Sequence, residues 1–166
     1  AAMPPVLGGG SMIRRVRRDG FAPADLPAKF EAGTPPIVPA IGLGAAIDYL
    51  LAIGLDAIDQ HEQLLTERAH EVLADVGGVQ MIGPPPERKG GIVSFAVEGV
   101  HAHDVAQLLD RRGVAIRAGH HCTMPLHKRL KLTATARASF YFYNTPEEID
   151  VLASALVDAK NVFRRA

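Results

Sequence analysis

Apolar residues recur at helical spacing along residues 56–76, and polar residues occupy the opposite side. The apolar positions are Ile58, Leu65, Ala69, Val72 and Leu73; the polar ones are Asp59, Glu62, Glu67 and Arg68. This period predicts an amphipathic surface helix, which the Gly77-Gly78 pair ends. The preceding residues, 41–54, are apolar and alanine-rich throughout, and they predict another helix that stops near Gly54.

Short alternating segments follow and predict strands. Residues 79–82 and 92–97 are the first two, and in the second Val93, Phe95 and Val97 fall on one side. Residues 114–117 and 135–142 predict two more strands. The proline- and glycine-rich residues 84–91 predict an exposed connection between the first two.

Two further helices complete the pattern. Residues 102–112 predict a helix that Gly113 stops and that turns Val105, Leu108 and Leu109 inward. Residues 145–148, Thr-Pro-Glu-Glu, predict the start of a last helix, with threonine as cap and proline first. Its expected buried stripe is Ile149, Leu152, Ala153, Leu156 and Phe163. The order helix, strand, strand, helix, strand, strand, helix predicts a small α+β domain with helices packed on a mostly antiparallel sheet.

The first 39 residues do not have the pattern of an independent unit. They are rich in glycine and proline, and we interpret the glycine run at residues 8–10 as a flexible tether rather than a ligand loop. We interpret the basic cluster at residues 14–18 as a solvated strand or loop. We expect two parts, 1–54 and 55–166, of which the first is a severed piece of something larger.

Composition and charge exclude several classes of protein. The 166 residues carry 18 basic and 18 acidic side chains, so the electrostatic argument for nucleic-acid binding is absent. No apolar run approaches the roughly 20 residues that span a bilayer, and the N-terminus has no signal-peptide pattern. One cysteine forms no internal disulfide, so we expect a cytoplasmic protein.

Cys122 is the first candidate for chemistry. An isolated cysteine is more often a small buried apolar residue than a nucleophile. Here, however, it follows Arg117, Gly119, His120 and His121 in a polar strand-to-loop junction, where positive charge or a base favours the thiolate. The adjacent histidines, together with His101 and His103, suggest a metal site as a weaker alternative.

Two other residues have both a structural and a functional interpretation. Arg137 lies within an alternating strand pattern, where it forms either a structural ion pair or a bidentate clamp for a carboxylate. Thr34 belongs to a Gly-Thr step before a helix, which either turns the chain or offers a hydroxyl and an N–H group to a phosphate.

Four motifs together resemble one protein family. Residues 114–126, Val-Ala-Ile-Arg-Ala-Gly-His-His-Cys-Thr-Met-Pro-Leu, closely resemble the active-cysteine loop of the SufS-type (group II) cysteine desulfurases. Residues 136–139, followed by Tyr-Asn-Thr at 143–145, match a second landmark, and residues 30–35 and 8–13 match two more in the right order. The resemblance covers nearly the whole chain, and the cysteine loop is its most specific piece.

The resemblance implies the fold and the activity. It implies the C-terminal small domain of a fold-type I pyridoxal-phosphate transferase at residues 55–166, with a strip of the large cofactor-binding domain at residues 1–54. The full enzyme would be a homodimer that converts L-cysteine to L-alanine and leaves a persulfide on Cys122 for iron–sulfur cluster assembly.

The resemblance also implies a role for each matching residue. Arg137 would hold the substrate carboxylate, and Arg117 and His121 would complete the substrate side of the cysteine loop. Thr34 would reach the cofactor phosphate of the neighbouring subunit. His103 would engage a sulfur acceptor of the SufE or SufU type. No nucleic acid or membrane is expected as a partner.

The cofactor lysine of this family is missing. It belongs upstream of the glycine run, and none of the five lysines, Lys29, Lys89, Lys128, Lys131 and Lys160, lies in such a motif. We therefore expect no covalently bound cofactor and no activity from this chain alone. The alternative is a stand-alone persulfide carrier or partner-binding module that uses Cys122 without cofactor chemistry.

Overall fold

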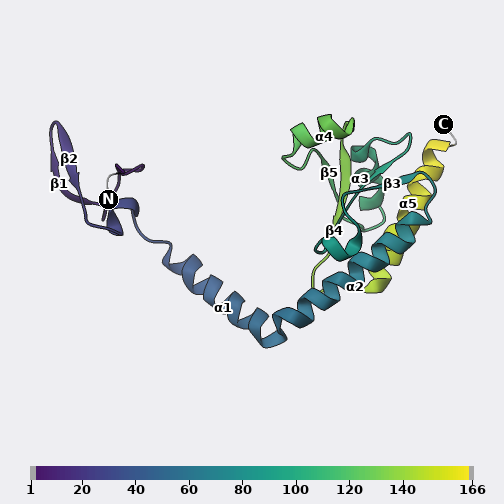
Figure 1. The fold of residues 1–166 in the computed structure, drawn as a ribbon, viewed down its shortest axis with the longest axis horizontal. Helices are drawn as coiled ribbons and strands as arrows, with labels where there is room; N and C mark the ends of the chain where they lie inside the picture. The colour runs from purple at the N-terminus through teal and green to yellow at the C-terminus, as the bar shows by residue number, and fades with distance from the viewer. Residues whose placement is uncertain (1–2, 165–166) are drawn as a thin grey trace. The chain divides into compact units, whose positions relative to one another are not determined.

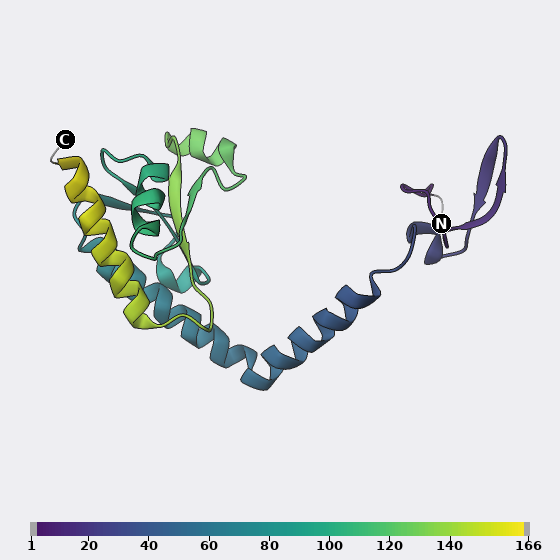
Figure 2. The same ribbon diagram turned by 180° about the vertical axis from the view of Figure 1, so that it is seen from behind.

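The chain consists of two compact units. The computed structural model describes residues 3–164, and its contacts divide the chain into Ala1–Ala52 and Ile53–Ala166. Figure 1 and Figure 2 follow the elements of each unit by colour along the chain.

The first unit is built around a two-stranded hairpin. Strand β1 (Ile13–Arg17) pairs antiparallel with β2 (Gly20–Pro23), and a short 3-10 helix, η1 (Ala28–Phe30), follows. The basic side chains of β1 are exposed, as expected for a solvated strand. Met12 is the one buried residue among the described residues of this unit.

The glycine run is packed, which contradicts its interpretation as a flexible tether. The carbonyl of Gly10 accepts hydrogen bonds from the backbone N–H groups of Met12 and Gly33, at 2.8 and 2.9 Å. A Cβ on Gly9 would lie only 3.1 Å from the nitrogen of Gly33. Gly9 is therefore needed for the close approach of two backbone segments, which sequence pattern alone does not reveal.

Helix α1 (Ile37–Ile53) begins four residues earlier than predicted. Its third residue is Pro39, which the first turn tolerates because the N–H groups there have no acceptor within the helix. No residue of α1 is buried. No single helix among residues 3–164 is long and apolar enough to cross a membrane; α1 and α2 together reach the length and composition as a bent pair, which is weak evidence.

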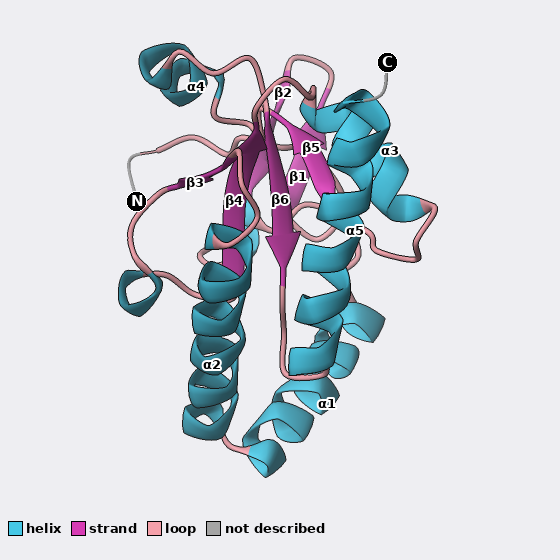
Figure 3. Cartoon of the chain, turned by 90° about the vertical axis from the view of Figure 1, so that its right-hand side faces the viewer, coloured by secondary structure: helices cyan, strands magenta, loops and turns pink. Residues whose placement is uncertain are grey.

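The second unit is a four-stranded antiparallel sheet with helices on one face. The strand order is β3 (Val79–Ile82), β4 (Ile92–Val97), β6 (Thr135–Ser139) and β5 (Arg117–Gly119). The helices are α2 (Leu55–Ala74), α3 (Ala102–Asp110) and α5 (Pro146–Arg164), with α4 (Met124–Leu130) and η2 (Pro86–Arg88) in connections. Figure 3 shows α2 and α5 running along the sheet. The predicted α+β class is confirmed.

The core lies between the sheet and its three helices. Val93, Phe95 and Val97 alternate inward from β4, as predicted, and Ala136 and Ala138 do the same from β6. The helices contribute Leu65, Ala69 and Leu73 from α2, Val105 and Leu109 from α3, and Ile149, Leu152, Ala155, Leu156 and Ala159 from α5.

Three predicted features were wrong in detail. Strand β5 begins at Arg117 rather than residue 114, because only from Arg117 onward does it pair with β6. Strand β6 ends at Ser139, where its pairing with β4 ends. Phe163 is 40% exposed, and Ala155 and Ala159 take its place in the buried stripe of α5.

The start of α5 agrees with its predicted cap. The Glu148 carboxylate accepts a hydrogen bond from the backbone N–H of Thr145 at 3.1 Å and another from the side-chain amide of Asn144 at 2.9 Å. These hydrogen bonds favour the ionised carboxylate and lower the pKa of Glu148.

Candidate functional site

Two arginines lie side by side on the sheet face that is turned away from the helices. Arg117 of β5 is the direct cross-strand partner of Arg137 of β6, and Ser94 of β4 is the partner of Arg137 on its other side. Like charges in directly opposite positions destabilise a sheet. An anion bound next to Arg117 and Arg137 would therefore reduce the repulsion between these two side chains and stabilise the sheet.

Arg137 does not form the structural ion pair that was one of its two interpretations from the sequence. The ion pairs of the described residues involve Arg14, Arg68 and Arg112 instead. The Nε atom of Arg137 is buried and has no hydrogen-bond partner. A guanidinium with an unused buried donor fits a carboxylate ligand, because a bidentate carboxylate satisfies two N–H groups at once.

Cys122 lies in a tight turn between β5 and α4. His121 and Cys122 have φ angles of 50° and 61°, in the left-handed region that residues other than glycine rarely adopt. The turn is closed by two hydrogen bonds that Thr123 donates to the carbonyl of His120, from its N–H at 2.8 Å and its hydroxyl at 2.7 Å. Cys122 is exposed, so it is not a small buried apolar residue.

His121 presents an unused acceptor nitrogen beside this turn. Its Nε2 atom lies 3.0 Å from the carbonyl oxygen of Thr135, so Nε2 carries the proton and donates. Its Nδ1 atom is buried without a partner. Burial, with the charges of Arg137 and Arg117 as further causes, lowers the pKa of His121 and keeps the ring neutral.

His127 holds the cysteine turn in place, and sequence reasoning missed it. It is only 5% exposed. Its Nδ1 lies 3.3 Å from the hydroxyl of Thr123, and its Nε2 lies 3.1 Å from the hydroxyl of Thr135. The helical spacing from Thr123 to His127 was the available signal, but nothing in the sequence indicates that Thr135 is their neighbour.

The two histidine pairs do not form a metal site in the structure. Within residues 3–164, no group of three or more histidine, cysteine or acidic side chains is placed to hold a metal ion. His101 instead caps α3, where its Nδ1 accepts a hydrogen bond from the backbone N–H of His103, and the two rings stack with centroids 5.4 Å apart.

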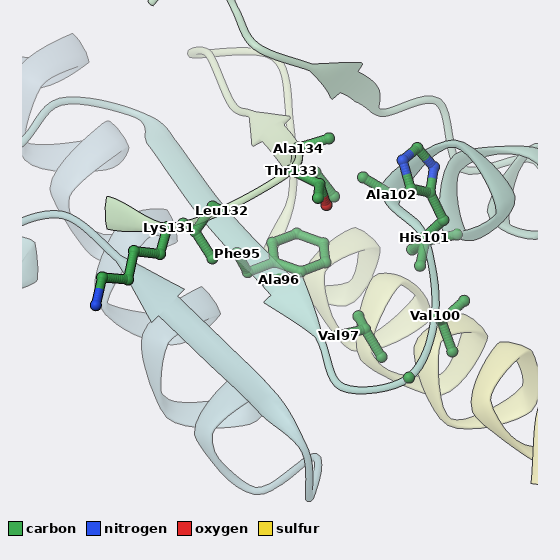
Figure 4. Close-up of a pocket in the computed structure, with 13 residues that line it drawn as sticks. Phe95, Ala96, Val97, Val100, His101, Ala102, Lys131, Leu132, Thr133 and Ala134 are labelled. Carbon is green, nitrogen blue, oxygen red and sulfur yellow. The ribbon is translucent and has the colours of Figure 1, made fainter. Parts of the chain in front are cut away.

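A cavity of about 360 Å³ lies beside His101, at the end of the sheet where β5 leads into the cysteine turn. It is lined by the end of β4, the start of α3 and residues 131–134. Figure 4 shows Phe95 and Ala96 beneath Thr133 and Ala134, with His101 and Val100 on the opposite side and the Lys131 ammonium directed away. Most of the side chains that line the cavity are therefore apolar.

Thr34 lies in the first unit, and no lysine lines its pocket. The pocket, about 390 Å³, is formed by Leu7 and residues 30–36, with Gly33 at a positive φ of 90°. Lys89, in the second unit, has its Nζ atom 3.0 Å from Nε2 of His70. Among the described residues, Thr34 and the turn at Gly33 line this pocket.

The comparisons with known proteins agree on one family. The family model for class-V aminotransferases matches residues 1–152. The chain is 49% identical to a cysteine desulfurase of Haloferax volcanii and 52% identical to a probable cysteine desulfurase of Staphylococcus aureus. Each alignment covers 97% of this chain but only 38% and 39% of the relative, so the chain spans about two fifths of these relatives.

Solved structures give the same result. The cysteine desulfurase CsdA of Escherichia coli, solved as an S-sulfonic acid, superimposes with a TM-score of 0.87 at 36% identity. The apo cysteine desulfurase of Thermococcus onnurineus gives 0.86 at 42% identity. They cover 96% and 95% of this chain and 39% and 40% of their own chains. The chain therefore belongs to the class-V aminotransferase family, and it corresponds to the C-terminal portion of a cysteine desulfurase.

Proposed function

We propose that the protein to which this chain belongs is a cysteine desulfurase in which Cys122 takes sulfur from L-cysteine as a persulfide. One observation carries the proposal: the exposed Cys122 turn is the direct continuation of β5, whose first residue, Arg117, is paired with Arg137. The candidate nucleophile and the pair proposed to bind a carboxylate thus stand on two neighbouring, hydrogen-bonded strands, β5 with its following turn and β6. Rigid placement of this kind lowers the entropic cost of bringing reactants together.

Each side chain has a separate task in this proposal. Arg137, with its unpaired Nε, holds the substrate carboxylate, and Arg117 adds a second positive charge next to it. Neutral His121 accepts a hydrogen bond from the substrate at Nδ1. The left-handed turn keeps the Cys122 thiol in solvent, where it is accessible to substrate and to an acceptor.

The sulfur transfer is balanced without an added oxidant. The Cys122 thiolate attacks the sulfur of L-cysteine, an S–S bond forms, and the C–S bond of the substrate breaks as L-alanine is released after protonation. Pyridoxal phosphate, where the complete protein binds it, supplies the electron sink for the substrate carbon. Thr34 would donate its hydroxyl to the phosphate of the cofactor in a neighbouring subunit.

We further propose that the enzyme is a homodimer that serves iron–sulfur cluster assembly and that His103 engages its acceptor protein. His103 lies in the first turn of α3, next to Ala102, which lines the cavity described above. Residues 1–54 would belong to the large cofactor-binding domain, and residues 55–166 to the small domain; the contacts divide the chain two residues earlier, between Ala52 and Ile53.

The test uses the complete enzyme. With L-cysteine, Cys122 should gain the mass of one sulfur atom, and Cys122→Ala should form neither persulfide nor L-alanine above background. Arg137→Lys should raise KM for L-cysteine about tenfold or more, because lysine cannot form the bidentate contact. The matched control, Ser139→Ala, lies on the same strand but is exposed and should leave both parameters unchanged. Persulfide formation in Cys122→Ala would overturn the proposal.

A persulfide carrier without cofactor chemistry is the second candidate. The observation that favours it is that Cys122 stands on a unit with its own complete core. The chain alone should then accept sulfur on Cys122 from a small persulfide donor. Release of L-alanine from L-cysteine by the chain alone, with pyridoxal phosphate added, would exclude this candidate.

A further inference from the structure

The segment that contains Cys122 has a strong charge asymmetry. Residues 111–146 hold seven basic residues and no acidic residue, in a chain whose formal charge is zero. The seven are Arg111, Arg112, Arg117, Lys128, Arg129, Lys131 and Arg137. All 18 acidic residues that balance the net charge of the chain lie outside residues 111–146. The positive charge of this segment is therefore a local feature and does not follow from the overall composition.

Three of these charges gather on one exposed element directly after Cys122. Lys128 and Arg129 lie in the last turn of α4, and Lys131 is its C-terminal cap residue. All three are exposed, and none takes part in the ion pairs found within residues 3–164. Arg112, in contrast, is neutralised by Asp158 on α5. Among residues 3–164, no ion pair therefore compensates the positive charge beside Cys122.

Apolar side chains are exposed on the same helix. Met124 is 61% exposed, Leu126 is 50% exposed and Leu130 is 46% exposed, and His127 is the one buried residue of α4. We name as the α4 surface the residues Met124, Leu126, Lys128, Arg129, Leu130 and Lys131. Exposed apolar side chains that lie together on one element mark interaction sites, where methionine and arginine are enriched.

The cavity beside His101 adjoins this surface. Residues 131–134, which follow α4, form one wall of the cavity, and the N–H of Leu132 donates to the carbonyl of His127 at 2.9 Å. The cavity and the cysteine turn lie at the same end of the sheet, since Gly119 pairs with Thr135 there. The acidic residues at this end, Asp75, Glu98 and Asp104, belong to the β3 and α3 side and not to α4.

We propose that the α4 surface and this cavity dock an acidic acceptor protein that carries an apolar side chain next to its sulfur-accepting cysteine. The inference rests on the proposed function and names the chemistry of its partner. Acidic groups of the acceptor pair with Lys128, Arg129 and Lys131, and charge complementarity of this kind accelerates encounter. The apolar side chain of the acceptor enters the cavity.

The transfer step is a thiol exchange. The acceptor thiolate attacks the outer sulfur of the Cys122 persulfide, a new S–S bond forms, and the bond from that sulfur to Sγ of Cys122 breaks. Cys122 leaves as the thiolate and the acceptor holds the persulfide, so no external oxidant or reductant is needed.

The chain itself permits a direct test, because Cys122 is its only cysteine. Cys122 is converted to a mixed disulfide with 4-thiopyridine, and release of the thiopyridone is followed with two cysteine peptides of equal length, one rich in aspartate and one rich in lysine. At low ionic strength the acidic peptide should react about tenfold faster per thiolate, and about 0.5 M salt should remove most of the difference. Equal rates for the two peptides would overturn the proposal.

Substitutions assign the effect to the α4 surface. Lys128→Glu should lower the preference for the acidic peptide about threefold, because it reverses one of three neighbouring charges. Arg111→Glu is the matched control: it makes the same charge change within the basic segment but at the other end of α3, and it should leave the preference unchanged. An equal loss in both variants would show a general charge effect and contradict the assignment.

The cavity has its own test. An acidic peptide with phenylalanine beside its cysteine should react several-fold faster than the same peptide with serine, and Thr133→Trp, at the cavity wall, should abolish that difference. Absence of any phenylalanine effect would remove the cavity from the docking surface. Binding to vesicles of phosphatidylserine, with no preference among the peptides, would show a lipid-binding surface instead and overturn the proposal.

These outcomes are separable from failure of the proposed function. If the complete enzyme forms no persulfide on Cys122 while the peptides still show the charge preference, the docking surface stands and the desulfurase proposal fails. If the persulfide forms but the peptides react alike, the docking inference fails alone.

Discussion

The two units of this chain use apolar residues in opposite ways. In the second unit, apolar side chains from three helices and two central strands meet in one core. In the first unit, Met12 alone is buried among the described residues, and α1 exposes large apolar side chains around its whole circumference, including Val38 at 79% and Leu43 at 62%. A helix that is apolar on all sides is typical of a buried helix.

This difference indicates where stability resides. The second unit buries the groups that stabilise it, so it is expected to fold by itself. The first unit holds a hairpin, a packed glycine turn and a helix whose apolar surface this chain does not cover. Cys122, the proposed nucleophile, and the arginine pair belong to the second unit, and Thr34 belongs to the first.

The sharpest test compares the same substitution in both units. Leu65→Ala in α2 removes a fully buried side chain and should lower the free energy of unfolding by about 3–5 kcal/mol, because it combines lost burial with a cavity. Leu43→Ala in α1 should change it by less than about 0.5 kcal/mol. Urea denaturation followed by circular dichroism measures both. Equal losses would show that the two units share one cooperative core.

A smaller effect is expected at the polar anchor of the cysteine turn. Thr135→Val keeps the shape of the side chain but leaves Nε2 of the buried His127 without its partner, which should cost about 1–3 kcal/mol. The variant should also alter the reaction rate of Cys122 with a thiol reagent, since His127 holds that turn. Thr133→Val, at an exposed position two residues earlier, is the control and should do neither. An unchanged unfolding midpoint in Thr135→Val would show that the buried hydrogen bond is dispensable.

The smallest expected effect is a pH dependence. The pKa of His121 and the pKa of His70 are lowered in the folded state from the ordinary value of 6.5, with burial as the largest cause. The unfolded chain therefore binds more protons just below pH 6.5, so stability is fully present above that pH and falls as the pH drops toward the folded-state values. His121→Asn should make this slope shallower, and urea midpoints between pH 5 and 8 measure it. If neither His121→Asn nor His70→Asn changes how the urea midpoint depends on pH, these two histidines are not the cause of the pH dependence.

Much of the second unit was predictable because its signals are local. The alternation of Val93, Phe95 and Val97 and the cap from Thr145 to Glu148 depend on residues a few positions apart. The prediction of one exposed, polar cysteine junction depends likewise on the immediate neighbours of Cys122. Neighbouring residues determine whether a segment has the period of a helix or a strand and how a helix is capped. Intrinsic propensity and capping act between residues that are only a few positions apart.

Tertiary structure decided what depends on distant partners. Arg117 and Arg137 became neighbours, and β5 began at Arg117, only through pairing with β6. His127 became the anchor of the cysteine turn because Thr135, eight residues later, meets it in space. The glycine run packed because Gly33 approaches it, and Phe163 remained exposed because Ala155 and Ala159 took the buried positions of α5. The sequence by itself determined the period of most elements and singled out Cys122 as a candidate. Strand pairing and burial determined the surroundings of Cys122, since both are properties of contacts between segments far apart in the chain.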